Sequence, residues 1–344
     1  MKVTDKKRLG RVALDVTVLG FGTVALGNLF KPILEAQAND TFAAAWDVGI
    51  RYFDTAPLYG HGLGELRTSA GLRQKSRDEY VLSSKVGRLL RPRPRGAIEF
   101  GGWVDATPFE LVYDYSYDGT MRAFEDSLQR LALERMEICF IHDIDVFTRG
   151  KEQPEVFRQA MDGCYRALAK LRSDGVLKAI GVGVNEWEVC EAALEQRDFD
   201  CFLLAGRYSL LEQGALQSFL PLCLERNVAV VIGGGFNSGI LATGAIEGAR
   251  YNYGPAPASV MERVRRIEVV ARDFDVPLQA AAAQFVTAHP AVASLIIGAR
   301  SPGQVRQIAS WFESPIPAEL WDALKAAKIL RDDAPTPNAS LRGG

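Results

Sequence analysis

Three segments of the chain place a side chain that can move or stabilise a proton directly after an apolar run. Asp54 ends the first run, with Tyr59 shortly behind it, while Lys85 ends the second run and His142 the third. The pKa of an ordinary tyrosine is about 10, too high for efficient acid–base catalysis at neutral pH. A nearby lysine cation stabilises the phenolate, and lowering the pKa by about two units requires about 2.7 kcal/mol. We therefore expect Asp54 to hold Lys85 protonated, Lys85 to lower the pKa of Tyr59, and His142 to orient a substrate oxygen or share the proton path.

Each of these side chains alone has a structural explanation. An Asp or Lys at the end of a strand more often makes a structural or solvent contact. A lone His after an apolar strand is more often a hydrogen-bonded core residue. The four groups form a site only if the fold brings the ends of their strands together.

Short apolar runs alternate with helix-length amphipathic segments along the chain. Eight runs are rich in Val, Ile and Phe, as parallel strands buried on both faces should be. They are residues 18–22, 50–54, 80–85, 137–142, 179–184, 200–204, 228–232 and 294–297. Helices are predicted over residues 40–48, 64–72, 119–131, 155–172, 186–194, 214–225, 259–274 and 302–311. Asp40 and Ser259 are the expected N-caps of two of these helices, and Pro302 suits a first helical turn.

Eight strand–helix units predict an α/β fold, a single closed (β/α)8 TIM barrel. An open doubly wound sheet is the alternative, but the unbroken alternation favours closure. Residues 8–18 are consistent with a short N-terminal hairpin ahead of the barrel. We assign residues 8–330 to one barrel domain and residues 331–344 to a polar C-terminal tail that should fray from Asp332 onward. The active sites of such barrels lie at the carboxyl ends of the strands, where Asp54, Lys85 and His142 would meet.

Residues 86–117 form a long loop after the third strand, and a connection of that length is usually functional or disordered. It holds four arginines, Arg88, Arg91, Arg93 and Arg95, followed by Trp103, Phe109 and Tyr113. The arginine run is interpreted as a solvated flank rather than a phosphate site. The aromatic part is a candidate wall of a substrate pocket, with Trp103 as a candidate substrate contact.

Composition excludes several classes of partner. The 40 Lys and Arg against 42 Asp and Glu give a net charge of −2, which provides no global attraction to nucleic acid or to an anionic membrane. No stretch approaches the roughly 18 to 20 apolar residues of a membrane span. The charged start lacks the apolar run of a signal peptide. The five cysteines have no metal-type spacing and are expected to be reduced core residues of a cytoplasmic protein.

Residues 54–60 (DTAPLYG), 84–85 (SK) and 141–142 (IH) resemble, in order and spacing, the Asp–Tyr–Lys–His tetrad of the aldo-keto reductases. The likeness extends from Leu19 to Ile308. Within the family the chain most resembles the L-fucose and D-threo-aldose 1-dehydrogenase subgroup, which includes L-galactose and pyridoxal 4-dehydrogenase relatives. Residues 114–119, 142–145, 206–213 and 234–239 carry this closer resemblance. It implies an enzyme that uses NAD or NADP.

The resemblance implies a dinucleotide bound without a Rossmann domain. Residues 20–27 and 181–183 indeed lack the glycine spacing of that fold's fingerprint. A barrel holds dinucleotide phosphates on late loops and helix N-termini, so residues 297–304 are candidates for the adenosine end. By resemblance, Asn185 binds the carboxamide and residues 236–241 lie against the pyrophosphate. The candidate cofactor-binding residues are Gly22, Thr23, Asp54, Asn185, Asn237, Ser238, Gly239, Leu241, Gly298, Arg300 and Gln304.

The sequence departs from the family pattern at several positions. Many members have a Gln at the position of Ala205, a stacking Tyr or Trp at Gly233, a Pro at Ile297 and an Asn at Ile308. Members selective for NADPH hold the 2′-phosphate with a Lys and an Arg, where this chain has Gly298 and Gln304. Arg300 could replace these cations only in part, so we expect NAD to be favoured.

The resemblance implies that Tyr59 takes a proton from a substrate hydroxyl while hydride leaves the carbon, with Tyr59, His142 and Trp103 contacting the substrate. The expected substrate is an aldose such as L-fucose or a D-threo-aldose, oxidised at C1 to a lactone in carbohydrate metabolism. Pyridoxal, or an aldehyde or ketone in general, is the alternative within the class, and a nucleotide-sensing auxiliary subunit is the alternative outside it. Metal-dependent hydrolysis is disfavoured because the chain has three histidines, so no metal site is predicted.

Overall fold

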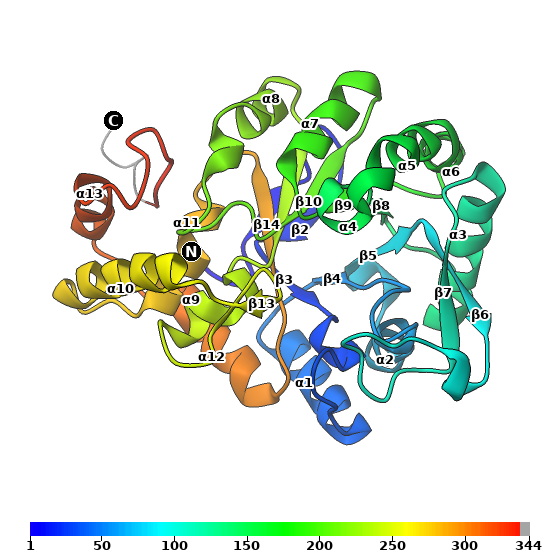
Figure 1. The fold of residues 1–344 in the computed structure, drawn as a ribbon, viewed down its shortest axis with the longest axis horizontal. Helices are drawn as coiled ribbons and strands as arrows, with labels where there is room; N and C mark the ends of the chain where they lie inside the picture. Colours follow the sequence, from blue (N-terminus) through cyan, green and yellow to red (C-terminus); the bar gives the residue numbers. More distant parts are fainter. Residues whose placement is uncertain (338–344) are drawn as a thin grey trace.

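A closed eight-stranded barrel forms the centre of the computed structural model, which describes residues 1–337 (Figure 1). The strands are β3 (Leu19–Gly22), β4 (Tyr52–Asp54), β5 (Val81–Val86), β8 (Ile138–His142), β9 (Ala179–Val184), β10 (Cys201–Ala205), β11 (Ala229–Gly233) and β14 (Val292–Ile297). Neighbouring strands are parallel, and β14 pairs with β3 to close the ring. The predicted (β/α)8 TIM barrel is confirmed, and the open sheet is excluded.

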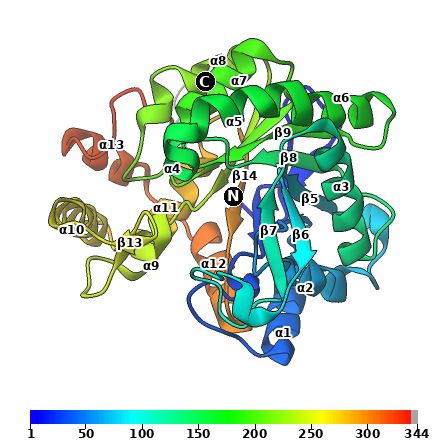
Figure 2. The same ribbon diagram turned by 45° about the vertical axis from the view of Figure 1, so that its right-hand side comes forward.

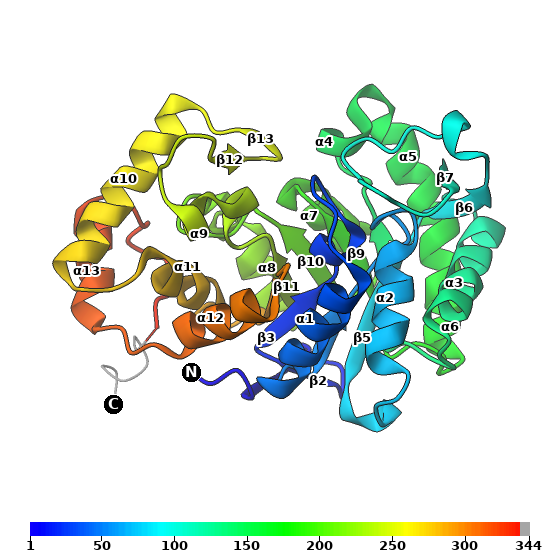
Figure 3. The ribbon, with the colours of Figure 1, turned by 90° about the horizontal axis from the view of Figure 1, so that it is seen from below.

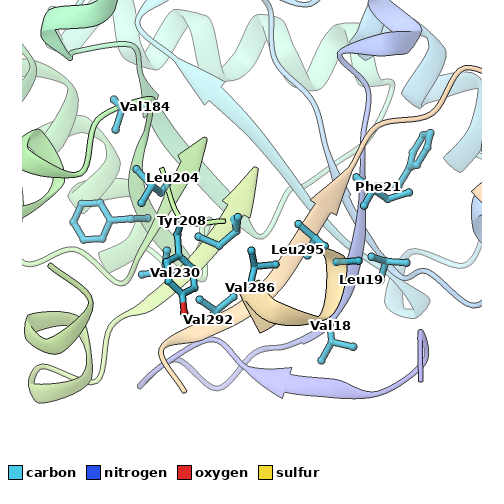
Figure 4. Close-up of a cluster of buried hydrophobic side chains, with 14 of the residues drawn as sticks. Val18, Leu19, Phe21, Val184, Leu204, Tyr208, Val230, Val286, Val292 and Leu295 are labelled. Carbon is cyan, nitrogen blue, oxygen red and sulfur yellow. The ribbon is translucent and has the colours of Figure 1, made fainter. Parts of the chain in front are cut away.

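Helices surround the barrel and cover the outward faces of its strands (Figure 1). They are α1 (Glu35–Asp47), α2 (Leu63–Leu72), α3 (Tyr117–Leu131), α5 (Gln153–Gln159), α6 (Tyr165–Ser173), α7 (Trp187–Gln196), α8 (Phe219–Glu225), α11 (Leu278–Thr287) and α12 (Pro302–Glu313). A π-helical turn, Ala160–Cys164, joins α5 to α6. Outward strand residues such as Leu19, Val230 and Leu295 pack with helix residues such as Val286 in this outer core (Figure 4). The five cysteines are buried and unpaired.

The N-terminal hairpin closes one end of the barrel. Its strands β1 (Lys6–Arg8) and β2 (Asp15–Thr17) pair antiparallel, as predicted. Leu9, Leu14 and Val16 pack against inward strand residues in a second apolar cluster. Gly10 permits this contact, since it has a φ of +56° and a Cβ there would lie 2.5 Å from the Asn227 carbonyl oxygen. Because the hairpin covers this end, the carboxyl ends of the strands form the candidate mouth of the barrel.

Two of the three predicted helix-start residues are wrong. Helix α1 begins at Glu35, so Asp40 lies inside it, and α10 (Ala258–Asp273) has Pro257 rather than Ser259 at its N-cap. Pro302 does begin α12. The seventh barrel helix is also misassigned, because α11 packs on β14, whereas α10 lies outside against α11 and α13 (Ala318–Ala326).

The segment after β5 is an ordered hairpin rather than an irregular loop. Strands β6 (Arg88–Pro92) and β7 (Phe109–Tyr113) pair antiparallel, and the hairpin lies beside α3 (Figure 2). Arg91, Arg93 and Arg95 are exposed, as predicted for a solvated flank. Arg88 is buried, so that interpretation is wrong for this residue.

A second short hairpin reaches over the mouth from the other side. Strands β12 (Arg250–Tyr251) and β13 (Gly254–Pro255) lie above the strand ends at the same end of the barrel as the segment that joins β6 to β7 (Figure 3).

The segment that follows α13 is held against the barrel domain. The Arg331 backbone N–H donates to Gln213 Oε1 at 2.8 Å, and Ala334 is buried. The predicted fraying therefore does not begin at Asp332. Residues 338–344 lie outside the described residues.

Candidate active site

The four residues of the expected proton-transfer cluster converge at the barrel mouth. Asp54 ends β4, Lys85 lies in β5, His142 ends β8, and Tyr59 follows β4 in a turn. Lys85 Nζ donates to Asp54 Oδ2 at 2.7 Å and to the Thr55 carbonyl oxygen at 2.8 Å. The same Nζ lies 4.8 Å from the centre of the Tyr59 ring.

The Asp54 carboxylate is held on both oxygens. Ser83 Oγ donates to Asp54 Oδ1 at 2.7 Å, while Lys85 occupies Oδ2. The Asp54 and Lys85 side chains are 3% and 1% exposed, so water does not screen their attraction. This buried pair is therefore a rigid support beneath Tyr59.

The Tyr59 phenol is neutral at neutral pH. Burial raises its pKa well above the ordinary value because the phenolate is poorly solvated, and the Asp54 carboxylate adds to this effect. The expectation that Lys85 lowers the Tyr59 pKa is wrong in this structure. Asp54 neutralises the lysine, and the Lys85 Nζ lies over the face of the Tyr59 ring, 4.8 Å from its centre.

His142 is also neutral. Burial lowers its pKa well below the ordinary value, and the Arg88 and Lys85 cations lower it further. Its ring meets the Tyr59 ring edge-on, with centroids 6.2 Å apart. The Trp103 ring lies 6.0 Å from the Tyr59 ring, so the three predicted substrate contacts adjoin one another, although only Tyr59 lines the neighbouring cavity.

A cavity of about 600 Å³ opens beside this cluster and extends to the loop before α12. Of the candidate cofactor residues, nine line it: Gly22, Asp54, Asn185, Asn237, Ser238, Gly239, Gly298, Arg300 and Gln304. Thr23 and Leu241 are fully buried outside the lining, and the Thr23 hydroxyl bonds Thr55 Oγ1 at 2.8 Å. The volume is within the range of ligand sites, roughly 300–1,000 Å³.

Several polar side chains of the cavity already have partners in the protein. Asn237 Nδ2 donates to the Gly206 carbonyl oxygen at 2.9 Å, and Asn185 Oδ1 accepts from Tyr253 Oη at 3.1 Å. Ser238 Oγ accepts from the Tyr253 backbone N–H at 3.0 Å. Asn237 thus ties together the loops after β10 and β11, a role that its family position did not predict.

The charge of the cavity suits a dinucleotide. Arg207, Arg250 and Arg300 line it, and none forms an ion pair with a carboxylate of residues 1–337. Asp54 is the acidic lining residue, and Lys85 neutralises it. An anionic pyrophosphate would therefore meet uncompensated positive charge. The residues present fit the cofactor that the sequence resemblance implies.

Three side chains near the site escaped sequence reasoning. Arg88 stood in a run of arginines, although its place directly after a strand end was a usable signal. Tyr253 and Arg207 lie on loops whose position over the mouth depends on tertiary packing, and Arg207 Nη1 donates to Asn252 Oδ1 at 2.8 Å. No sequence periodicity marks such loop residues.

Known proteins match both the chain and its fold. The profile of the Aldo/keto reductase family matches residues 18–329. Pyridoxal 4-dehydrogenase of Microbacterium luteolum is 44% identical over 96% of this chain and 99% of its own length. D-threo-aldose 1-dehydrogenase of a Pseudomonas species is 38% identical over 94% and 96%. An aldo-keto reductase of Bacillus halodurans, solved in its holo form, superposes with a TM-score of 0.73 at 25% identity, covering 95% of this chain and 97% of that one.

The chain thus has a closed barrel, the expected proton-transfer cluster at its mouth, and a match to one family over nearly its whole length. The chain belongs to the aldo/keto reductase family. It is an oxidoreductase, and NAD(P) is the cofactor of its family. The family predicted from the tetrad is confirmed, and so is the resemblance to the aldose and pyridoxal dehydrogenases. No helix of residues 1–337 is long and apolar enough to cross a bilayer.

Proposed function

We propose that this enzyme oxidises the cyclic hemiacetal form of an aldose at C1, giving a lactone, with NAD as the oxidant. One observation carries the proposal: Tyr59, which lines the cavity, contacts both the buried Lys85–Asp54 pair and the His142 ring. The D-threo-aldose 1-dehydrogenase relative supports the substrate class. We take L-fucose and the D-threo-aldoses as the first candidates.

In this reaction the O–H and C–H bonds at C1 both break. Bound oxidised nicotinamide supplies the hydride acceptor and a positive charge that favours the Tyr59 phenolate. Tyr59 Oη takes the hydroxyl proton as the C1–O double bond forms. The neutral His142 holds the substrate oxygen by a hydrogen bond, and the Trp103 ring lies beside Tyr59 with ring centres 6.0 Å apart. Lys85 and Asp54 keep the tyrosine in place.

The cofactor preference proposed is NAD. Arg300, the cation near the adenosine end, already donates from Nη1 to the Leu29 carbonyl oxygen at 3.2 Å and from Nη2 to the Lys31 carbonyl oxygen. With these donors occupied and no cation at Gly298 or Gln304, a 2′-phosphate gains little at this site.

Pyridoxal is the second candidate substrate. The pyridoxal 4-dehydrogenase relative supports it, and the aromatic pair Tyr59 and Trp103 would suit a planar ring. An aldehyde beside a hydroxymethyl group closes to a cyclic hemiacetal, so the same proton and hydride transfers would give a lactone. The two candidates therefore share one chemical step.

A panel of sugars, pyridoxal and simple aldehydes, each assayed with NAD and with NADP, tests the proposal. We expect NAD-dependent turnover of an aldose, with pyridoxal as the second candidate, and a lactone product. Activity only on open-chain aldehydes would contradict hemiacetal oxidation. Tight nucleotide binding without turnover of any compound would favour the nucleotide-sensing auxiliary subunit.

A further inference from the structure

Arg88 is the buried arginine of the β6–β7 hairpin, and its guanidinium lies against His142. Nη1 is 3.1 Å from His142 Nδ1. Nη2 donates to Asp143 Oδ2 at 2.5 Å and to Tyr113 Oη at 3.2 Å. The side chain is 4% exposed, so these contacts are shielded from water. A planar fork of this kind holds its partners in a fixed geometry.

The contact determines which ring nitrogen of His142 carries the proton. A guanidinium stays protonated in proteins and has donors but no acceptor. His142 Nδ1 must therefore accept from Arg88 Nη1. In the neutral imidazole the single proton then resides on Nε2, which leaves Nε2–H as the donor.

We propose that Arg88 is a positioning residue of the active site, which holds His142 as the neutral tautomer protonated on Nε2 so that it donates a hydrogen bond to the substrate oxygen. The proposal rests on the proposed function, in which His142 contacts that oxygen. Arg88 acts through His142.

The backbone around His142 supports the same arrangement. Tyr115 Oη lies 2.9 Å from the carbonyl oxygens of both His142 and Asp143. Asp143 adopts a φ of 53°, an unusual conformation for a residue other than glycine. This conformation accompanies the contact of its carboxylate with Arg88, so the end of β8 is fixed both through its carbonyl groups and through the Asp143 side chain.

The charges that face His142 come from several elements. Lys85 of β5 and Arg88 of β6 are cations, Tyr59 is neutral, and Tyr113 of β7 meets Arg88. Asp143 Oδ1 lies 3.5 Å from His142 Nε2, but Arg88 compensates its charge. Removing Arg88 would therefore delete one cation and leave a buried carboxylate beside the imidazole. Both changes raise the pKa of His142 and favour its protonation.

The test is the ¹⁵N NMR spectrum of histidine-labelled protein, followed as a function of pH. The chain has three histidines, and a His142→Asn sample identifies the signals of His142. In the wild type we expect a protonated Nε2, an unprotonated Nδ1 and no titration near neutral pH. In Arg88→Met we expect the pKa of His142 to rise and kcat to fall about a hundredfold, because the donor is misplaced.

Three further variants separate charge, geometry and folding. Arg88→Met combined with Asp143→Asn removes both buried charges, so His142 should again stay neutral at pH 7. Arg88→Lys keeps a cation beside Asp143 without the fork, so the pKa of His142 should stay low while kcat remains reduced. Arg91→Met, an exposed change on the same hairpin, should alter neither the spectrum nor kcat. Thermal unfolding confirms that each variant is folded.

A proton on Nδ1 in the wild type would overturn the proposal. An unchanged His142 titration in folded Arg88→Met would also overturn it, because loss of activity alone would then reflect a structural role. If the spectra agree but no hemiacetal is oxidised, the proposed function fails while the assignment of Arg88 to the His142 tautomer stands.

Discussion

Lys85 Nζ donates to Asp54 Oδ2 over 2.7 Å in a part of the barrel that solvent does not reach. The pair lies beneath the face of the Tyr59 ring, so the ion pair supports the residue that we propose exchanges a proton with the substrate. Stability and activity should therefore respond differently when the two charges are removed together.

Lys85→Met should destabilise the protein by about 3–5 kcal/mol, because it leaves the Asp54 carboxylate buried without a counter-charge. Asp54→Asn combined with Lys85→Met should recover most of this loss, since no buried charge remains, yet turnover should stay low. Urea unfolding of the two variants measures the difference. Equal stability of Lys85→Met and wild type would show that the pair is not a structural support.

Tyr59→Phe should lower kcat by roughly 10²–10⁴-fold while leaving the affinity for NAD nearly intact. The change removes one hydroxyl and keeps the ring that packs on Trp103 and faces Lys85. Steady-state kinetics and a fluorescence titration with NADH measure the two quantities. Retained turnover would remove Tyr59 from its proposed role.

The oxidation rate should rise with pH through the neutral range. Tyr59 must be deprotonated to accept the hydroxyl proton, and burial raises its pKa, so the active phenolate becomes more abundant as pH increases. His142 is already neutral there because its pKa is lowered. The pH profile of kcat from about pH 6 to about pH 10 measures this dependence. A rate that falls as pH rises would contradict a tyrosine base.

Gly298→Lys should improve the use of NADP relative to NAD, because it adds a cation where NADPH-selective members of the family have one. A Cβ at Gly298 would meet atoms no closer than 3.9 Å, so the change fits the backbone. The ratio of kcat/KM for the two cofactors is the measurement. As the matched control, Arg300→Ala should not reduce NADP use more than NAD use; a selective loss of NADP activity would show that Arg300 binds the 2′-phosphate.

Stability should fall as pH drops from about 6.5 to about 4, partly through His289. Burial, together with a smaller contribution from the Lys7 cation, lowers the pKa of His289 to about 4. Between these pH values His289 becomes protonated in the unfolded chain but stays neutral in the folded protein. The stability present above pH 6.5 is therefore lost as pH falls, by up to about 3 kcal/mol.

His289→Asn tests this contribution. Nδ1 accepts the Ala291 backbone N–H at 3.1 Å, and an Asn oxygen offers a similar acceptor without titrating. Urea unfolding at several pH values should therefore show a shallower acid loss in the variant. An identical pH dependence in both proteins would assign the loss to other groups.

The strand ends were predictable because buried parallel strands leave continuous apolar runs, and those runs stop at Asp54, Lys85 and His142. Helix α11 was missed for a physical reason: it is buried nearly all round, so its sequence shows no amphipathic period. Helix α10 has an amphipathic stripe, and this pattern alone predicts a helix that packs on the barrel. An amphipathic stripe indicates that one face of a helix is buried but does not identify the element that buries it.

The inward turn of Arg88 was not predictable from its neighbours. Four arginines of similar local sequence stand in the segment, and burial of one depends on Asp143, which is distant in sequence. The pKa of Tyr59 was also mispredicted, because the sequence indicated the Lys85–Asp54 pair but not how deeply the Tyr59 hydroxyl is buried. Such pairings are set by tertiary structure.

In the proposed reaction, hydride leaves C1 of a hemiacetal while Tyr59 takes the hydroxyl proton. The most direct measurement is a reaction of L-fucose, or another aldose found active, carrying deuterium at C1, followed by mass spectrometry of both products. We predict that deuterium moves to the reduced nicotinamide, that the sugar becomes a lactone, and that Tyr59→Phe forms both products far more slowly. Reduced cofactor without deuterium, or a sugar oxidised at another carbon, would contradict it.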